Sequence, residues 1–345
     1  MQKEKKQTKW GDLNYFNKFH TKNYILTSLL LVALFIILYF SFDPTDMFSY
    51  TAGIYINILI YILLAVSLNI TVGLMGQLSL GHAGFIAIGG YTAALISKSM
   101  LSSGLPNFIQ LLISSIIGGS VACVFGLILG GITLRLRGDY LAIITLAFGE
   151  IVKYIIQNIP FLGGATGLKN IPTITNFVNS FFIVIISVIV MSMVMTSRKG
   201  REVLSIRENE IAAENIGIDI NKVKLYGFAL SAFFAGIGGS LFAHNLGILT
   251  PDKFGFMFSI EILVMVVFGG LGSITGGVIA ATILTLVNEQ LRDISQFRYL
   301  VYSIILIVLM IFRPEGIFGT KEFTLPRLAR GVKRFKNKVK NKNEE

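Results

Sequence analysis

The stretch MFSIEILVMVVFGGLGSITGGVIAATILTLV, residues 257–287, decides how the chain folds. Its 31 residues would form one helix about 46 Å long at about 1.5 Å per residue, whereas the hydrocarbon core of a bilayer is about 30 Å thick. The glycine-rich centre, 269–273, favours a break. We therefore expect two short helices, 257–268 and 274–287, which a membrane tolerates where other helices surround them.

The rest of the chain has the composition of a polytopic membrane protein. Charged residues make up 14% of the 345 residues, against about 25% in soluble proteins. This excludes a soluble enzyme and a disordered protein, and long unbroken apolar runs argue against an outer-membrane barrel. We expect an all-α fold. The eight other apolar runs are 24–42, 50–72, 82–97, 107–133, 140–158, 176–196, 225–247 and 299–312.

Basic residues gather at four places, and their distribution predicts the orientation. They lie in the tail 1–23, the turn 135–137, the segment 197–224 and the chain after 312. If all four places face the cytoplasm, the number of crossings must be even. Counting the broken stretch as two gives about ten membrane segments, with both termini cytoplasmic in a plasma membrane.

The predicted domain organisation follows from the same distribution. Residues 1–23 form a basic cytoplasmic tail, 24–318 the transmembrane domain with the cytoplasmic loop 197–224, and 319–345 a second basic tail. This second tail either binds anionic membrane lipids or is a disordered segment that only obeys the charge rule. Nucleic-acid binding is not expected, because no nucleic-acid fold accompanies the charge.

The sequence lacks the motifs of an enzyme. It contains no G-x-x-x-x-G-K-[ST] phosphate loop, no G-x-S-x-G turn and no H-E-x-x-H pair. Its one cysteine and three histidines are scattered, so neither a metal site nor a cofactor is expected. Transport is then the default function of a polytopic helical protein.

Charges inside the apolar runs bear on the energy source. Glu150 and Lys153 stand at i and i+3 and can pair on one helix face. The alternative is that Glu150 lines a transport path, as acidic residues do in ion-coupled carriers. Acids and histidines form no chain that would suit a proton relay, so a secondary carrier is the lesser hypothesis.

The charged segment SRKGREVLSIRENEIAAENIGIDINKVK, 197–224, has a helical pattern of apolar residues. Gly217 suits a helix end and Asp219 can cap the next helix. We expect one or two short helices that either bind a soluble partner or lie on the bilayer surface. Acidic residues intermixed with six basic ones favour the partner, since surface-lying helices are mostly basic.

Several motifs together resemble the branched-chain amino acid ABC permease family, in particular its LivM-type subunit. AAENIG, 212–217, looks like part of the coupling motif of ABC importer permeases, with Ile211 where that motif has Glu. The wider match covers about 50–318 and consists of GQLSLGHAGFIAIGGYTAALI (76–96), RLRGDYLAIITLAFGEIVK (135–153), GGATGLKNIP (163–172), GREVLSIRENEIAAENIGI (200–218) and FGGLGSITGGVIAA (268–281).

The resemblance implies a type II ABC importer that moves Leu, Ile or Val into the cytoplasm by alternating access. The expected partners are a homologous second permease, two ATPase subunits and an extracytoplasmic substrate-binding protein. Similar permeases import urea and short amides, so these substrates stay open. The residues expected to contact the ATPase are Arg207, Glu208, Glu210, Ala212, Ala213 and Gly217.

A translocation path is expected where glycines and small polar residues interrupt the apolar runs. The segment 76–82 is either unwound and lines a cavity or is a plain cytoplasmic turn, whereas the glycines after it suit close helix packing. The path candidates are Gln77, Ser79, His82, Glu150, Gly269, Gly270 and Ser273.

Overall fold

The apolar runs of the sequence form helices with nearly the predicted bounds. The computed structural model describes residues 50–101, 104–133, 136, 138–291, 300, 303, 304, 307 and 316, all within one structural unit, 48–322. The run 24–42, most of the run 299–312, both basic tails, and Arg135 and Arg137 lie outside the described residues. The longer helices are α2 (Tyr50–Asn69), α3 (His82–Ser99), α4 (Asn107–Thr133), α5 (Asp139–Asn158), α6 (Phe177–Thr196) and α9 (Ile220–Leu246).

The stretch 257–287 is broken as predicted. Helix α10 (Phe256–Gly269) ends at the glycine cluster and α11 (Ile274–Gln290) begins after it. Gly270 and Gly272 have φ of 113° and 88°, which side chains with a Cβ rarely adopt. The Ser273 hydroxyl caps α11 by accepting from the Gly276 N–H at 3.0 Å.

Helix α9 is central to the described part, where it packs against α2, α3 and α4. Glycines allow the backbones of α3 and α9 to approach closely. A Cβ on Gly89 would lie 2.2 Å from the Gly236 Cα, and one on Gly239 would lie 2.1 Å from the Ile86 carbonyl oxygen. The predicted packing role of the α3 glycines is therefore confirmed for Gly89.

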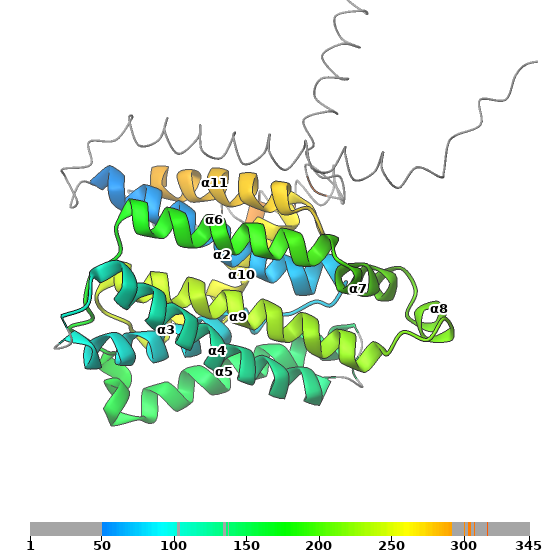
Figure 1. The fold of residues 1–345 in the computed structure, drawn as a ribbon, viewed down its shortest axis with the longest axis horizontal. Helices are drawn as coiled ribbons and strands as arrows, with labels where there is room; N and C mark the ends of the chain where they lie inside the picture. Colours follow the sequence, from blue (N-terminus) through cyan, green and yellow to red (C-terminus); the bar gives the residue numbers. More distant parts are fainter. Residues whose placement is uncertain are drawn as a thin grey trace, which may run out of the picture. The chain divides into compact units, whose positions relative to one another are not determined.

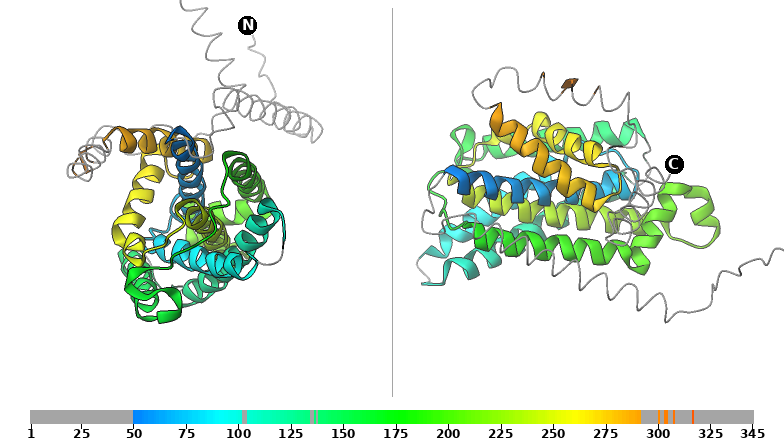
Figure 2. Two further views of the ribbon diagram at one scale, coloured as in Figure 1. Left: turned by 90° about the vertical axis from the view of Figure 1, so that its left-hand side faces the viewer. Right: turned by 90° about the horizontal axis from the view of Figure 1, so that it is seen from above.

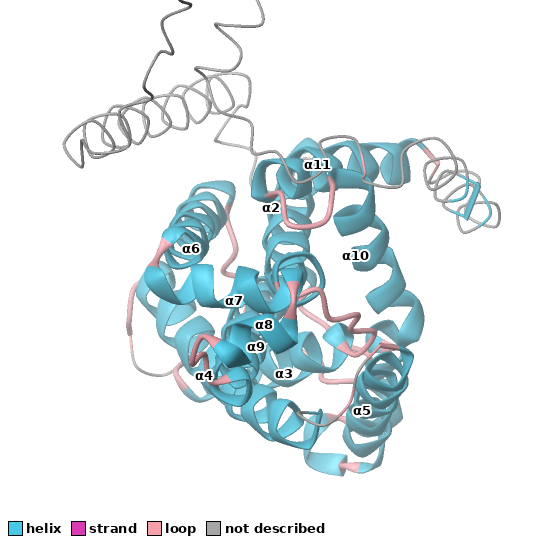
Figure 3. Ribbon diagram, turned by 90° about the vertical axis from the view of Figure 1, so that its right-hand side faces the viewer, coloured by secondary structure: helices cyan, strands magenta, loops and turns pink. Residues whose placement is uncertain are grey.

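The helices lie side by side along one direction (Figure 1), end-on and lengthwise in the two views of Figure 2. The short helices α7 (Arg198–Glu208) and α8 (Glu210–Asn215) lie across one end of these helices (Figure 3). Four stretches in the described part are long and apolar enough to cross a bilayer, namely Tyr50–Leu74, Asn107–Thr133, Phe177–Thr196 and Ile220–Leu246.

At the opposite end (Figure 1), the glycine-rich segment 163–167 is tied to the chain after α9. Leu168 and Leu249 form an isolated antiparallel bridge with N···O distances of 2.8 and 3.0 Å. A Cβ on Gly167 would lie 2.2 Å from the Leu249 carbonyl oxygen. At this end, backbone hydrogen bonds fix one loop against another, whereas at the other end the chain forms the helices α7 and α8.

Candidate functional site

The charged segment 197–224 folds into two capped helices, as its pattern predicts. Ser197 caps α7, and Asn209 caps α8 by accepting from the Ala212 N–H at 3.0 Å. Gly217, with φ of 86°, ends the turn after α8, and Asp219 caps α9 by accepting from the Lys222 N–H at 3.1 Å. The side-chain hydrogen bond from Lys222 holds the pKa of Asp219 below its usual value.

The six predicted ATPase-contact residues face in different directions. Glu208, Ala212 and Gly217 are exposed, whereas Ala213 is buried. Arg207 and Glu210 are half-buried, and both bind groups of their own chain. The predicted set therefore divides into an outward part that a partner can reach and an inward part.

Two apolar side chains of this segment point outward, which the pattern did not predict. Ile211 is 66% exposed and Ile216 is 75% exposed. The helical pattern of apolar residues in this segment does not tell whether another element covers the apolar face. We define the outer surface of α8 as Glu208, Ile211, Ala212, Ile216 and Gly217.

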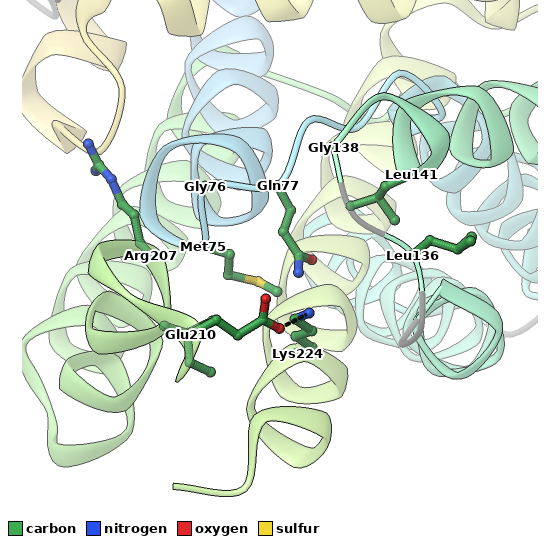
Figure 4. Close-up of a pocket in the computed structure, with 10 residues that line it drawn as sticks. Met75, Gly76, Gln77, Leu136, Gly138, Leu141, Arg207, Glu210 and Lys224 are labelled. Carbon is green, nitrogen blue, oxygen red and sulfur yellow. Dashed lines mark hydrogen bonds and ion pairs between the residues drawn. The ribbon is translucent and has the colours of Figure 1, made fainter. Parts of the chain in front are cut away.

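The inward part borders a hollow of about 160 Å³ between α8, α9 and the chain after α2. Lys224 donates to the Glu210 carboxylate inside it, and the Lys224 side chain is 4% exposed. Met75 and Gln77 project toward this ion pair (Figure 4). The Gln77 Oε1 atom is buried and has no hydrogen-bond partner among the described residues, so a polar acceptor is available in the wall of the hollow.

Arg207 also borders the hollow, but its guanidinium group points away from the ion pair (Figure 4). Its Nη1 atom donates to the Gly73 carbonyl oxygen at 2.6 Å, across 134 sequence positions. Gly73 belongs to η1 (Ile70–Leu74), a π-helical turn that continues α2. The charged segment is thus bonded to the end of a membrane-depth helix.

The end of α2 in turn holds the break between α10 and α11. The Asn69 side chain is buried; its Oδ1 atom accepts from the Gly272 N–H and its Nδ2 atom donates to the Ser273 carbonyl, both at 2.9 Å. We call Asn69, Gly73, Gly76, Gly272 and Ser273 the junction. Asn69 and Gly73 were not predicted as functional residues, because no local pattern distinguishes them within an apolar run.

The segment 75–81 is not helical and packs between other helices. The Leu80 N–H donates to the Thr145 hydroxyl of α5 at 3.0 Å, and a Cβ on Gly81 would lie 1.9 Å from the Thr145 carbonyl oxygen. The Ala83 N–H donates to the Ser259 hydroxyl of α10 at 3.0 Å. The Leu80 bond ties this segment to α5, whereas Gly76 and Leu78 are exposed, so a cavity-lining segment and a plain cytoplasmic turn both remain predictions.

The predicted path residues do not all meet. Gly269, Gly270 and Ser273 lie at or beside the junction, and Gln77 lines the hollow next to it. Ser79 is buried, and the His82 ring lies 2.9 Å from the buried Ser67 hydroxyl through Nε2. These two residues are enclosed by their own chain.

Glu150 lies apart from the junction, at the other end of α10. Its carboxylate binds Lys153 through Oε2, at 2.5 Å, and accepts from the Phe256 N–H through Oε1, at 2.9 Å. Helix α10 has 14 residues, so Glu150 and Gly269 are separated by roughly 20 Å. The ion pair that the i, i+3 spacing predicts is present, and the carboxylate also caps α10.

Chemically, the site combines a fixed charged loop, an ion pair and a glycine-lined joint between broken helices. Within the described ranges, His, Cys, Asp and Glu side chains form no group of three that could hold a metal ion. The arrangement connects a surface helix to the break between α10 and α11 through hydrogen bonds.

Comparison with known proteins places these features in a family context. Residues 50–313 match the family described as "Branched-chain amino acid transport system / permease component". The chain is 35% identical, over 294 residues, to the LivM permease protein of the high-affinity branched-chain amino acid transport system of Escherichia coli, covering 75% of this chain and 68% of that protein.

Two further relatives are more distant. The BraD permease protein of Pseudomonas aeruginosa is 25% identical over 285 residues, covering 76% of this chain and 92% of that protein. The LivH permease protein of Escherichia coli is 24% identical over the same length and the same shares. No solved structure shows a significant match.

Proposed function

The chain belongs to the family of branched-chain amino acid transport permease components, and from this premise we propose that it imports leucine, isoleucine and valine as one subunit of an ATP-driven importer. The family match and the four long apolar helices of the described part identify a multi-pass membrane protein. The relatives LivM and LivH carry separate names, which supports a homologous second permease subunit beside this chain.

The outer surface of α8 carries the proposal. Ile211 and Ile216 are exposed on an otherwise charged segment at one end of the helices. Exposed apolar side chains rimmed by charged ones are typical of protein contacts. Because the sequence lacks a phosphate loop, ATP hydrolysis falls to a separate chain, and we place the two ATPase subunits against this surface.

The orientation follows from this placement. If α7 and α8 face the cytoplasm, the positive-inside rule puts both basic tails on the same side, with about ten membrane segments and the domain limits predicted above. An extracytoplasmic substrate-binding protein then meets the opposite end, where the segment 163–167 and the Leu168–Leu249 bridge lie.

Transport then proceeds by alternating access. ATP binding closes the ATPases against the outer surface of α8, the two permease subunits rock against each other, and a path beside the junction opens to one side at a time. The path residues nearest the junction are Gln77, Gly269, Gly270 and Ser273. The case for a path role is weaker for Ser79 and His82, which their own chain encloses, and for Glu150, which lies apart from the junction. Urea or a short amide is the alternative substrate class.

Copurification tests the proposal. The tagged native chain, extracted in mild detergent, is expected to bring down an ATPase, and Ile211→Asp/Ile216→Asp is expected to release it. The matched control is Lys199→Asp on α7, which also adds a carboxylate to an exposed position of the segment. If no ATPase copurifies with the native chain, and this chain alone takes up leucine under an ion gradient, the secondary carrier is favoured.

A further inference from the structure

The Gly73 carbonyl oxygen accepts a hydrogen bond from Arg207 instead of from a backbone N–H of its own helix. In a continuing α-helix this oxygen would accept from the Gln77 N–H. Here the π-helical turn shifts the pattern: the Met75 N–H donates to Ile70 at 3.1 Å and the Gln77 N–H to Thr71 at 3.0 Å. The orphan carbonyl at the helix end instead accepts from Arg207, and a cation is favoured there by the helix dipole.

Glycines shape the space that Arg207 occupies. A Cβ on Gly272 would lie 2.6 Å from the Arg207 Nη1 atom, and one on Gly76 would lie 3.2 Å from its Cγ atom. A Cβ on Gly73 would meet the Gly272 backbone nitrogen at 2.3 Å. The guanidinium group therefore lies where the end of α2 and the turn between α10 and α11 come closest.

The Arg207–Gly73 hydrogen bond connects the charged segment to a residue outside it. The hydrogen bonds of Ser197, Asn209, Asp219 and Glu210 described above begin and end within 197–224. The Arg207 bond instead reaches η1, and through Gly73 and Asn69 it adjoins the turn that leads into α11. A movement of α7 thus acts on the junction directly, besides its covalent links to α6 and α9.

We propose that Arg207 is a positioning residue that couples the movement of α7 to the junction, so that ATP use on the surface drives the rearrangement of the broken helices. This inference rests on the proposed function. It separates two tasks within the segment: the outer surface of α8 binds the ATPase, whereas Arg207 transmits its movement inward.

The test measures coupling apart from assembly. Native protein, Arg207→Ala and Arg207→Lys are purified with their partners and reconstituted in liposomes with the substrate-binding protein and radiolabelled leucine. Arg201→Ala is the matched control, because Arg201 lies on the same helix and bonds only the nearby Thr196 carbonyl in the hydrogen bonds described, at 3.1 Å. ATPase copurification, ATP hydrolysis and leucine uptake are measured on each preparation.

We expect Arg207→Ala to keep its ATPases and to hydrolyse ATP, while leucine moved per ATP falls at least about tenfold. Arg207→Lys retains a hydrogen-bond donor but not the planar guanidinium group. Its leucine moved per ATP is therefore expected to lie between the native protein and Arg207→Ala, and Arg201→Ala is expected to match the native protein. An unchanged ratio in Arg207→Ala, or an equal loss of hydrolysis and uptake, overturns the inference. Failure of the native chain to retain an ATPase overturns the proposed function with it.

A distance measurement covers the case in which Arg207→Ala is too unstable to reconstitute, and it then uses Arg207→Lys. Spin labels are placed at Lys199→Cys on α7 and Leu286→Cys on α11, both exposed, in a Cys123→Ala background. In the native complex ATP is expected to change the label distance, and in the Arg207 variants this change is expected to shrink. An equal change in both disproves the coupling role.

Discussion

Lys224 on α9 donates to the carboxylate of Glu210 on α8, and this ion pair closes the corner between the two helices. The Lys224 side chain is 4% exposed and that of Glu210 is 22% exposed. An ammonium group so far from water needs its partner, because an unpaired buried charge is costly. Glu210 therefore holds α8 in place, and under the proposed function we expect its substitution to change ATPase binding through α8.

The first prediction concerns this pair. Glu210→Gln leaves the Lys224 ammonium without a charged partner, and we expect it to lower the free energy of unfolding by about 1–3 kcal/mol, less than a fully buried pair because Glu210 is partly exposed. Glu210→Gln/Lys224→Met removes both charges and is expected to recover most of that loss. Thermal unfolding of the detergent-purified protein measures both, and equal destabilisation by the single and the double change would contradict the prediction.

The second prediction concerns Gly73. A Cβ there would lie 1.9 Å from the Asn69 Oδ1 atom and 2.3 Å from the Gly272 nitrogen, so Gly73→Ala must displace backbone and is expected to cost about 3 kcal/mol or more. Gly53→Ala, on the same continuous helix, meets nothing within 4 Å and serves as the control. Yield of monodisperse protein in size-exclusion chromatography is the measurement, with a large loss expected only for Gly73→Ala.

The third prediction concerns the amide that joins α2 to the α10–α11 break. Asn69→Ala leaves the Gly272 N–H and the Ser273 carbonyl without the Asn69 partner, and we expect a loss of about 2–4 kcal/mol in unfolding free energy. The exposed Asn158, which bonds only its own helix at Tyr154 among the hydrogen bonds described, is the control site. Similar unfolding midpoints for Asn69→Ala and Asn158→Ala would show that the junction contributes little.

The sequence predicts the helices well and the junction poorly, for a physical reason. Helix α4 has the predicted bounds, Asn107–Thr133, because the local composition determines where its apolar run begins and ends. The break at 269–273 is equally local, since length and glycines decide it. The Arg207–Gly73 bond spans 134 positions, and no periodicity within either segment carries that information.

Ile211 and Ile216 illustrate the second limit of local patterns. Helical periodicity shows which residues share a face, but coverage of that face depends on elements far away in the chain. In the structure these two isoleucines are exposed, and two of the predicted ATPase-contact residues, Arg207 and Glu210, turn inward.

The fourth prediction separates the ATP-driven importer from an ion-coupled carrier. Glu150 binds Lys153 and the Phe256 N–H, roughly 20 Å from the break at Gly269, which fits a clamp between α5 and α10 better than a proton relay. Glu150→Gln keeps an acceptor for Phe256 and loses the ion pair. We therefore expect leucine uptake by the reconstituted complex to stay within about threefold of the native rate, and we expect an uncoupler to leave this uptake unchanged.

The matched control is Gln157→Ala, which removes a second link of α5 to this region, the 2.6 Å bond from Gln157 to Asp252. Uptake that an uncoupler abolishes in the native protein, and that Glu150→Gln alone eliminates, would instead make Glu150 the coupling residue of a secondary carrier.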